Sequence, residues 1–316
     1  MLYCMAKKQF REQEMFHGSM VALVTPMDPT GAVDFQSLRD LVEWHVEEGT
    51  HAIVAVGTTG ESATLDVAEH VAVIRTVVEQ ARGRVPVIAG TGANSTAEAI
   101  ELTRAAIEAR ADAALLVSPY YNRPTQEGLY RHYGAIADAC HFPMILYNVP
   151  GRTSGDLLPE TAARLATRSC IVGIKEASGR VDRVGEILRL CEDQDASLEV
   201  YSGDDGAALA AMALGARGVI SVTANVAPRA MASMVSLALE GDFAAAREIN
   251  RRLVLLHRDL FVESNPIPVK WLLQDMHKIP AGIRLPLTPL PEGFYGRLRE
   301  ALKEARTFST PVSPIS

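Results

Sequence analysis

The sequence predicts an α/β fold, a (β/α)₈ or TIM barrel with a C-terminal helical appendage. Eight short β-rich runs alternate with amphipathic segments at roughly 30 residues per unit, the length of a strand–helix unit in this fold. A doubly wound sheet normally has fewer strands and a phosphate-binding glycine turn after the first strand, and no such turn follows Thr25. After the eighth unit the strand signal stops.

The predicted strands are short, apolar and rich in β-branched residues, as in sheets that are buried on both faces. They are Met20–Thr25, Ala52–Val56, Val85–Ala89, Ala113–Val117, Met144–Tyr147, Ile171–Ile174, Leu198–Tyr201 and Gly218–Val222. The amphipathic segments that follow them are Phe35–Glu48, Val67–Ala81, Ala97–Ala109, Glu127–Ala139, Pro159–Ala166, Val181–Cys191, Ala207–Leu214 and Met231–Glu240.

Three further helices are predicted beyond the barrel, the second of them opened by Asn265 and Pro266. Their ranges are Phe243–Phe261, Pro266–Gln274 and Pro291–Ala305. The chain therefore divides into an N-terminal extension at 1–16, a catalytic barrel at 17–240, a helical region at 241–306 and a Ser-, Thr- and Pro-rich tail at 307–316, which we expect to be disordered.

Composition indicates a soluble globular protein. The 316 residues are 48% hydrophobic and 22% charged, with a net charge of -7, and a mildly acidic chain does not favour nucleic acid as a partner. No apolar stretch approaches the ~20 residues of a membrane span, and the N-terminus lacks the apolar run of a signal peptide. We therefore expect a cytoplasmic protein that binds neither nucleic acid nor membrane.

No metal site or disulfide framework is expected. The four cysteines, at 4, 140, 170 and 191, have no CxxC spacing and are interpreted as reduced thiols. The histidines form no HxH or HExxH pair. Asp204 and Asp205 have no third ligand at suitable spacing, so helix capping is the favoured interpretation of this pair.

Lys175 directly follows the β-branched run Ile171–Ile174. Lysine is among the residues least often buried, and desolvation favours the uncharged amine, which can attack a ketone and form a Schiff base. The alternative is an ordinary lysine that points into solvent at a strand end. The other strand ends decide between these interpretations, because a barrel of this type does its chemistry there.

The strand ends carry hydroxyl, phenol, guanidinium and glycine-rich groups, a set that suits anionic carbonyl substrates. The stretches are Gly57–Glu61, Ser118–Pro124, Tyr147–Thr153, Ser202–Asp205 and Ile220–Thr223. Taken singly, each has another explanation. Gly57–Gly60 could be a capped turn, Tyr120 and Tyr121 could be core aromatics, and Arg152 could form a surface ion pair.

Taken together, these stretches resemble the dihydrodipicolinate synthase (4-hydroxy-tetrahydrodipicolinate synthase) family of pyruvate-dependent Schiff-base aldolases. The resemblance covers most of the chain, apart from the extension and the tail. The matching motifs are GTTGES (57–62), VIAGTGAN (87–94), PYYNRPTQEGLY (119–130), ILYNVPGRT (145–153), GIKEASG (173–179), SGDD (202–205), GVISVTANV (218–226) and NPIPVK (265–270).

The resemblance implies a lyase that joins pyruvate to L-aspartate 4-semialdehyde in the first committed step of diaminopimelate and lysine biosynthesis. Lys175 would form the imine with pyruvate, so no separate cofactor is implied. Tyr147 would move protons to and from the intermediate, and Thr58 would link it to Tyr121. Tyr121 would enter the site from a neighbouring subunit, within a homotetramer built from two dimers.

The resemblance also implies the substrate contacts. Thr59 and the backbone of Gly203 would hold the pyruvate carboxylate, Arg152 would hold the carboxylate of the semialdehyde, and the Ile220 carbonyl would help to place the lysine amine. The positions that match an allosteric L-lysine site are Ser62, Ala63, His70, Asn94, Glu98 and Tyr120. Val67 stands where lysine-sensitive members commonly have histidine, so we expect inhibition of altered strength.

Three alternatives stay open at the level of sequence. A sister enzyme, such as N-acetylneuraminate lyase or a keto-sugar-acid aldolase, would share the imine lysine, but Arg152 and Tyr121 favour the synthase. A catalytically silent barrel would not need intact Lys175, Tyr147 and Thr58. A pyridoxal phosphate enzyme would need a phosphate-binding glycine turn that the sequence lacks.

Overall fold

Eight parallel strands close into a barrel in the order β1 to β8, with β8 pairing back onto β1. The computed structural model describes residues 16–306, so the predicted disorder of the tail, and the extension apart from Phe16, lie outside the described residues. The strands are β1 (Gly18–Ala22), β2 (Ala52–Ala55), β3 (Val87–Gly90), β4 (Ala113–Val117), β5 (Met144–Asn148), β6 (Ile171–Glu176), β7 (Glu199–Ser202) and β8 (Gly218–Ser221).

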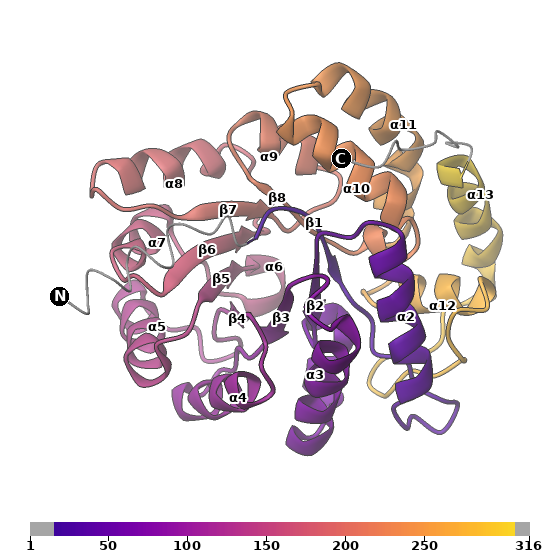
Figure 1. Cartoon of the computed structure of the whole chain (residues 1–316), viewed down its shortest axis with the longest axis horizontal. Helices are drawn as coiled ribbons and strands as arrows, with labels where there is room; N and C mark the ends of the chain where they lie inside the picture. The colour runs from indigo at the N-terminus through magenta and orange to yellow at the C-terminus, as the bar shows by residue number, and fades with distance from the viewer. Residues whose placement is uncertain (1–15, 307–316) are drawn as a thin grey trace.

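Helices surround the barrel, as Figure 1 shows with the strands at the centre. The helices of the barrel are α2 (Phe35–Glu47), α3 (Val67–Ala81), α4 (Thr96–Glu108), α5 (Gln126–Cys140), α6 (Pro150–Thr153), α7 (Pro159–Ala166), α8 (Arg183–Glu192), α9 (Ala208–Ala213) and α10 (Pro228–Leu239). Short 3₁₀ turns are η1 (Thr58–Gly60), η2 (Ser62–Thr64) and η3 (Thr223–Asn225). The predicted (β/α)₈ barrel is confirmed.

Three helices and a 3₁₀ turn follow the barrel, on the side where α10 and α2 lie (Figure 1). They are α11 (Phe243–Asp259), α12 (Ile267–Asp275), η4 (Glu292–Phe294) and α13 (Tyr295–Arg306). The predicted helical appendage is therefore present, while its division from a catalytic domain at residue 240 stays a prediction. No helix among residues 16–306 is long and apolar enough to cross a membrane.

Two layers of apolar side chains build the core. The outer layer lies between the strands and the helices, and the inner layer fills the barrel with residues that include Met20, Val54, Ile145 and Ile220. Tyr201 belongs to the inner layer and donates its hydroxyl to the carbonyl of Phe16, 2.9 Å away, just before β1 begins. The barrel interior is thus packed rather than open, which leaves the C-terminal strand ends for a site.

Candidate active site

Lys175 lies inside β6, which continues to Glu176 and is therefore longer than the predicted run Ile171–Ile174. Its backbone is in register with Tyr147 of β5 on one side and Tyr201 of β7 on the other. The residue is only 6% exposed. The alternative of a solvent-directed lysine at a strand end is therefore wrong.

Two glycines make room for the lysine and its neighbours. A Cβ atom at Gly203 would lie 2.6 Å from the Cβ of Ala177 and 3.0 Å from Cε of Lys175. A Cβ atom at Gly173 would lie 2.7 Å from Cε2 of Tyr201. Since real Cβ atoms do not approach other atoms this closely, a larger residue at Gly203 would displace the wall around the amine, and one at Gly173 would displace the ring of Tyr201.

A cavity of about 380 Å³ opens over Lys175 at the C-terminal ends of the strands. Most of the predicted catalytic and substrate residues line it, namely Lys175, Tyr147, Thr58, Thr59, Arg152 and Gly203. They come from β5, β6 and the segments that follow β2, β5 and β7. The sequence therefore identified one real constellation, although the role of each residue in it remains a proposal.

Lys175 and Tyr147 are in direct contact. The Nζ atom lies 4.3 Å from the centroid of the tyrosine ring, and both residues are buried. An amine over the face of a phenol is attracted to the ring electrons. This places a proton-carrying hydroxyl and a potential nucleophile on adjacent strands of one cavity.

A buried polar network fixes the ends of the two strands that carry this pair. Nδ2 of Asn148 donates to Oε2 of Glu176 at 3.1 Å and to Oδ1 of Asp156 at 2.9 Å. Arg183 on α8 forks onto Asp156 with bonds of 2.7 and 2.6 Å. Because Asn148 and Glu176 directly follow Tyr147 and Lys175, the network holds both side chains in place.

The turn η1 is held from two directions. Oγ1 of Thr25 donates to the Gly60 carbonyl at 2.7 Å, and Nδ2 of Asn265 donates to Oγ1 of Thr59 at 2.9 Å. An accepted bond at Oγ1 leaves the hydroxyl proton of Thr59 free to donate to a substrate. The structure shows no side-chain cap on η1, so the capped-turn explanation of Gly57–Gly60 is wrong.

Arg152 lies on α6, a helix that the sequence did not predict, and its Nη2 donates to the Asn265 carbonyl at 3.3 Å. Among residues 16–306, eight further residues line the cavity, and the sequence assigns none of them a role in it. Four of them belong to α11 and the segment after it, namely His257, Arg258, Phe261 and Asn265. Their helix was predicted, but only as part of an appendage. The NPIPVK motif gave a signal for Asn265, to which no role had been assigned.

Asp204 and Asp205 do not cap a helix, which corrects the favoured interpretation of this pair. Oδ2 of Asp205 instead accepts from the backbone N–H groups of Val222 and Thr223, each at 2.9 Å. Helix α9 has no side-chain cap. Over the described span, 16–306, no cluster of three or more His, Cys, Asp or Glu residues could hold a metal ion.

His257 stands against the same segment. Its Nδ1 is 2.9 Å from Oγ1 of Thr223, and the residue lines the cavity. Burial lowers the pKa of His257, while Asp205 and Asp204 act in the opposite direction. Because the net effect is a lowered pKa, the ring of His257 stays neutral to a lower pH than a free imidazole, although two carboxylates lie nearby.

Tyr121 and Ile220 are not part of the cavity lining formed by residues 16–306. Ile220 is buried in the inner layer of the barrel. Tyr121 is 91% exposed and has a φ angle of 74°, with a 2.9 Å bond from the Asn122 N–H to the Tyr120 carbonyl across it. This γ-turn is strained for a non-glycine residue and leaves the phenol exposed, outside the lining of the chain's own cavity.

Comparison with known proteins agrees with this geometry. The model of the dihydrodipicolinate synthetase family matches residues 15–305. The chain belongs to this family. The alternatives of a silent barrel and of a pyridoxal phosphate enzyme are thereby left without support.

Two curated relatives illustrate the degree of similarity to the dihydrodipicolinate synthetase family. The 4-hydroxy-tetrahydrodipicolinate synthase of Acidithiobacillus ferrooxidans is 73% identical over 292 residues, which cover 92% of this chain and 99% of the relative. The protein of the same name from Nitrosococcus oceani is 63% identical over 290 residues, 92% of this chain and 98% of the relative.

Solved structures of the family have the same fold. The chloride-inhibited dihydrodipicolinate synthase from Acinetobacter baumannii, complexed with pyruvate, is 56% identical and superposes with a TM-score of 0.89 over 92% of this chain and 99% of its own. The enzyme from Cyanidioschyzon merolae with lysine bound is 38% identical, with a TM-score of 0.89 over 94% of this chain and all of its own (100%).

The residues that match the family's effector site come from three neighbouring segments of the barrel. They are Ser62 and Ala63 in η2, His70 on α3, Asn94 before α4, Glu98 on α4 and Tyr120 after β4. Burial, and then the charge of Glu98, raises the pKa of Tyr120, so the Glu98 carboxylate acts on this phenol. His70 is buried, with Nε2 2.8 Å from the Gly90 carbonyl, and Val67 is 62% exposed.

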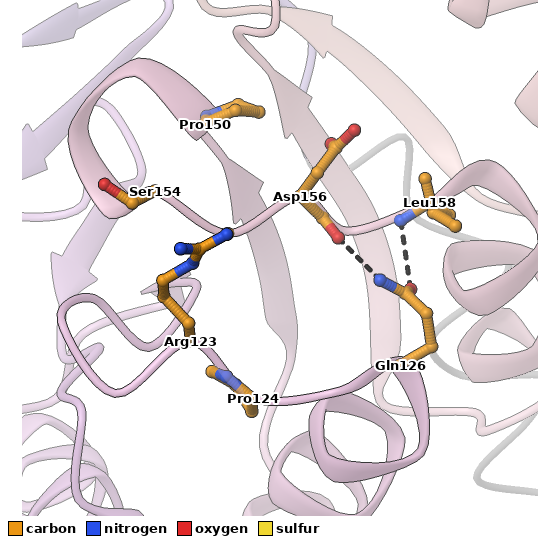
Figure 2. A pocket seen from close by; sticks show the side chains of 8 residues that line it. Arg123, Pro124, Gln126, Pro150, Ser154, Asp156 and Leu158 are labelled. Atoms are coloured by element: carbon orange, nitrogen blue, oxygen red, sulfur yellow. Dashed lines mark hydrogen bonds between the residues drawn. The ribbon is translucent and has the colours of Figure 1, made fainter.

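A second hollow, of about 360 Å³, lies where α6 meets α5 and α7. Figure 2 shows the guanidinium of Arg123 pointing into it, with Gln126 bridging two backbone groups on its far wall. Nε2 of Gln126 donates to the Asp156 carbonyl at 2.7 Å, and its Oε1 accepts from the Leu158 N–H at 3.2 Å. The bridge fixes the segment that follows Arg152, while none of the predicted site residues lines the hollow.

Proposed function

We infer that this chain condenses pyruvate with L-aspartate 4-semialdehyde to give 4-hydroxy-tetrahydrodipicolinate, as a lyase of the class I aldolase type. The product is the first committed intermediate of diaminopimelate and lysine biosynthesis. One observation carries the inference: the buried Lys175 opens into a cavity that also holds a phenol, two threonine hydroxyls and two guanidinium groups. The names of the relatives at 63% and 73% identity agree with it.

The chemistry needs no separate cofactor, because the lysine itself supplies the electron sink. The amine of Lys175 adds to the pyruvate ketone, and loss of water gives a protonated imine. The positive nitrogen makes a methyl proton acidic, and its removal gives an enamine. The enamine carbon attacks the aldehyde, and the amino group of the new chain then displaces Lys175 as the ring closes.

Proton transfer is assigned to Tyr147, Thr58 and Tyr121. Tyr147 is the phenol in contact with the Lys175 side chain, so it can deliver protons to the hydroxyl that leaves and take them from the methyl group. Thr58 lines the same cavity and would extend the relay. Tyr121 would complete it from a second copy of the chain, which fits its exposed position on a strained turn.

The carboxylates of the two substrates are assigned to different residues of the cavity. Thr59, with its hydroxyl proton free, and the backbone of Gly203 would hold pyruvate next to Lys175. Arg152 would bind the carboxylate of the semialdehyde, for which a guanidinium offers paired donors. The carbonyl of Ile220, on the inner wall, would help to orient the amine.

The test is an assay with both substrates, coupled to the next reductase, on wild type and Lys175→Ala. Activity should fall by about three orders of magnitude or more, because removal of a covalent nucleophile leaves only binding and polarisation. Borohydride with pyruvate should trap an adduct on Lys175 in the wild type. Near-normal activity of the variant, or no adduct, would refute the imine mechanism.

The proposal includes feedback inhibition by L-lysine. Glu98 offers a carboxylate for the effector's cationic end, and Tyr120 lies within reach of that charge. A relative from Cyanidioschyzon merolae has lysine bound. Added L-lysine should lower the steady-state rate, and Glu98→Gln should weaken this effect; a rate unchanged at millimolar lysine would end the idea.

The proposal also includes assembly into a tetramer of two dimers, in which Tyr121 completes the partner's site. Sedimentation should therefore give the mass of four chains. Tyr121→Phe and Lys175→Ala, mixed and refolded together, should regain activity above either alone, because some sites would combine an intact lysine with an intact tyrosine. A mixture no more active than its components would contradict a shared site.

We propose a cytoplasmic location and the division into a catalytic barrel at 17–240 and a helical region at 241–306. The free thiols of Cys140, Cys170 and Cys191 suit a reducing compartment. Fractionation of cells that express the tagged protein would test the location, and limited proteolysis near residue 240 would test the division.

A further inference from the structure

Glu61 directly follows the catalytic turn η1 and adopts an unusual backbone conformation. Its φ angle is 57°, in the left-handed region that non-glycine residues rarely enter. Its backbone N–H donates to the Thr58 carbonyl at 3.1 Å and so closes the turn. The side chain points inward and is fully buried, at 0% exposure. A charged residue in this place needs a partner.

The partner is Lys270 on α12, 209 positions further along the chain. Its Nζ atom donates to Oε1 of Glu61, and the lysine side chain is only 4% exposed. The backbone N–H of Arg284 donates to the other oxygen, Oε2, at 3.3 Å. Burial lowers the pKa of Lys270, and the Glu61 carboxylate opposes this. The C-terminal region therefore binds both carboxylate oxygens of Glu61, the residue that ends the turn.

The same region contacts the turn at a second point. Asn265, five residues before Lys270 in NPIPVK, donates to the Thr59 hydroxyl at 2.9 Å. The two contacts hold Thr59 and Glu61 on either side of Gly60, whose carbonyl accepts from Thr25. A displacement of α12 would thus move the hydroxyl that is assigned to the pyruvate carboxylate.

Stability alone does not account for a buried pair of this kind. Replacement of a buried ion pair by neutral groups of similar volume is often neutral or stabilising, whereas loss of one partner is strongly destabilising. The pair does fix geometry, because a carboxylate that is held from two sides cannot rotate. The exposed ion pair Asp275–Arg299, at the end of the same helix, has no such enclosure.

We propose that Lys270 is a positioning residue for the condensation, acting through Glu61 to set the turn Thr58–Gly60 so that Thr59 meets the pyruvate carboxylate. This rests on the proposed function, since it assigns the turn to pyruvate. It makes the C-terminal helical region part of the catalytic apparatus, although Lys270 itself does not line the cavity.

The test is the neutral double variant Glu61→Gln/Lys270→Met, which removes both charges and so leaves no buried charge without a counter-charge. We expect a denaturation midpoint close to wild type, a pyruvate KM raised on the order of tenfold, and an unchanged KM for the semialdehyde. Borohydride trapping should need correspondingly more pyruvate. The matched control, Asp275→Asn/Arg299→Met, should leave both KM values unchanged.

A second variant, Glu61→Asp, keeps both charges and shortens the carboxylate by one methylene. It should also raise the KM for pyruvate more than it lowers kcat. A pyruvate KM within twofold of wild type in both variants would overturn the proposal, as would a double variant that does not fold, because the pair would then be structural. Absence of a pyruvate adduct in the wild type would instead refute the proposed function itself.

Discussion

At the scale of single residues, Gly203 sets the space in which Lys175 can react. An added methyl group would lie 2.6 Å from Ala177 and 3.0 Å from the carbon that bears the reactive nitrogen. We expect Gly203→Ala to reduce the rate of imine formation by about a hundredfold, because small displacements of a reacting group are costly. Rapid-quench trapping with borohydride at saturating pyruvate measures this rate.

Gly185→Ala on α8 is the matched control, since an added Cβ there meets nothing within 4 Å. It should keep full activity and gain about 0.4–1 kcal/mol of stability. If Gly203→Ala keeps its fold and forms the imine at a rate within threefold of wild type, the residues packed around the amine move aside at little cost.

The sequence located Lys175 because a lysine at the end of a buried strand is unusual, and its neighbours at other strand ends were chemically consistent. It could not locate Asn265 and His257 in the same cavity. An asparagine before a proline predicts a helix start, and a histidine inside an amphipathic helix predicts nothing specific. Both residues reach the cavity through contacts that the local sequence does not encode, such as the bond from Asn265 to Thr59, 206 positions away.

At the scale of secondary structure, α8 shows how one helix can hold a buried and an exposed ion pair with different consequences. Arg183 at its start is 6% exposed, forks onto Asp156, and lies 3.9 Å from the buried Glu176 carboxylate. Arg183→Met should lower the free energy of unfolding by about 3 kcal/mol, because it leaves these carboxylates without their counter-charge. Denaturant unfolding measures the change.

Arg189→Met in the same helix is the control, because its ion pair with Asp193 is exposed. Such pairs contribute about 0–1 kcal/mol. Equal destabilisation by the two substitutions would mean that the network at the strand ends does not depend on Arg183.

Periodicity predicts the ends of most elements to within one or two residues. For β4, α3 and α7 the predicted bounds are the observed ones. The first strand was misplaced: the predicted Met20–Thr25 is observed as Gly18–Ala22. Val24 and Thr25 leave the sheet because distant groups bind them. The N–H of Val24 donates to Oδ1 of Asn225 at 3.1 Å, and the Thr25 hydroxyl donates to Gly60. Apolar character alone could not reveal that departure.

At the scale of the whole molecule, the barrel follows from eight alternating units, but the attachment of the C-terminal region does not. Its apolar side chains, such as Leu253 and Leu272, join the outer layer of the core, and charged residues add specific contacts. Arg284, for example, donates to Oε2 and Oε1 of Glu69 at 2.7 and 2.6 Å. Sequence periodicity is silent about pairs of this kind. The sequence therefore predicts the C-terminal region only as helices added to the barrel. In the structure this region also binds the segment that follows β2.

Acid stability is a property of the whole fold that depends on neutral buried histidines. His45 on α2 is fully buried, with Nδ1 2.9 Å from Oγ1 of Thr50. Burial, and then the charge of Lys278, lowers its pKa from 6.5 to about 3. Below pH 6.5 the unfolded chain therefore takes up a proton that the folded chain does not. The contribution of the neutral His45 ring to stability is therefore fully present above pH 6.5 and is lost as the pH falls toward 3.

Because of this proton uptake, the free energy of unfolding should fall by about a further 1.4 kcal/mol for each pH unit below pH 6.5. His45→Gln, which keeps a partner for Thr50 but cannot titrate, should remove that part of the slope between pH 6 and pH 4.5. Urea unfolding at several pH values measures it. His141→Asn, at an exposed position after α5, should keep the slope of the wild type. Parallel profiles for His45→Gln and wild type would mean that His45 gains a proton without unfolding, through local opening of α2 rather than loss of the whole fold.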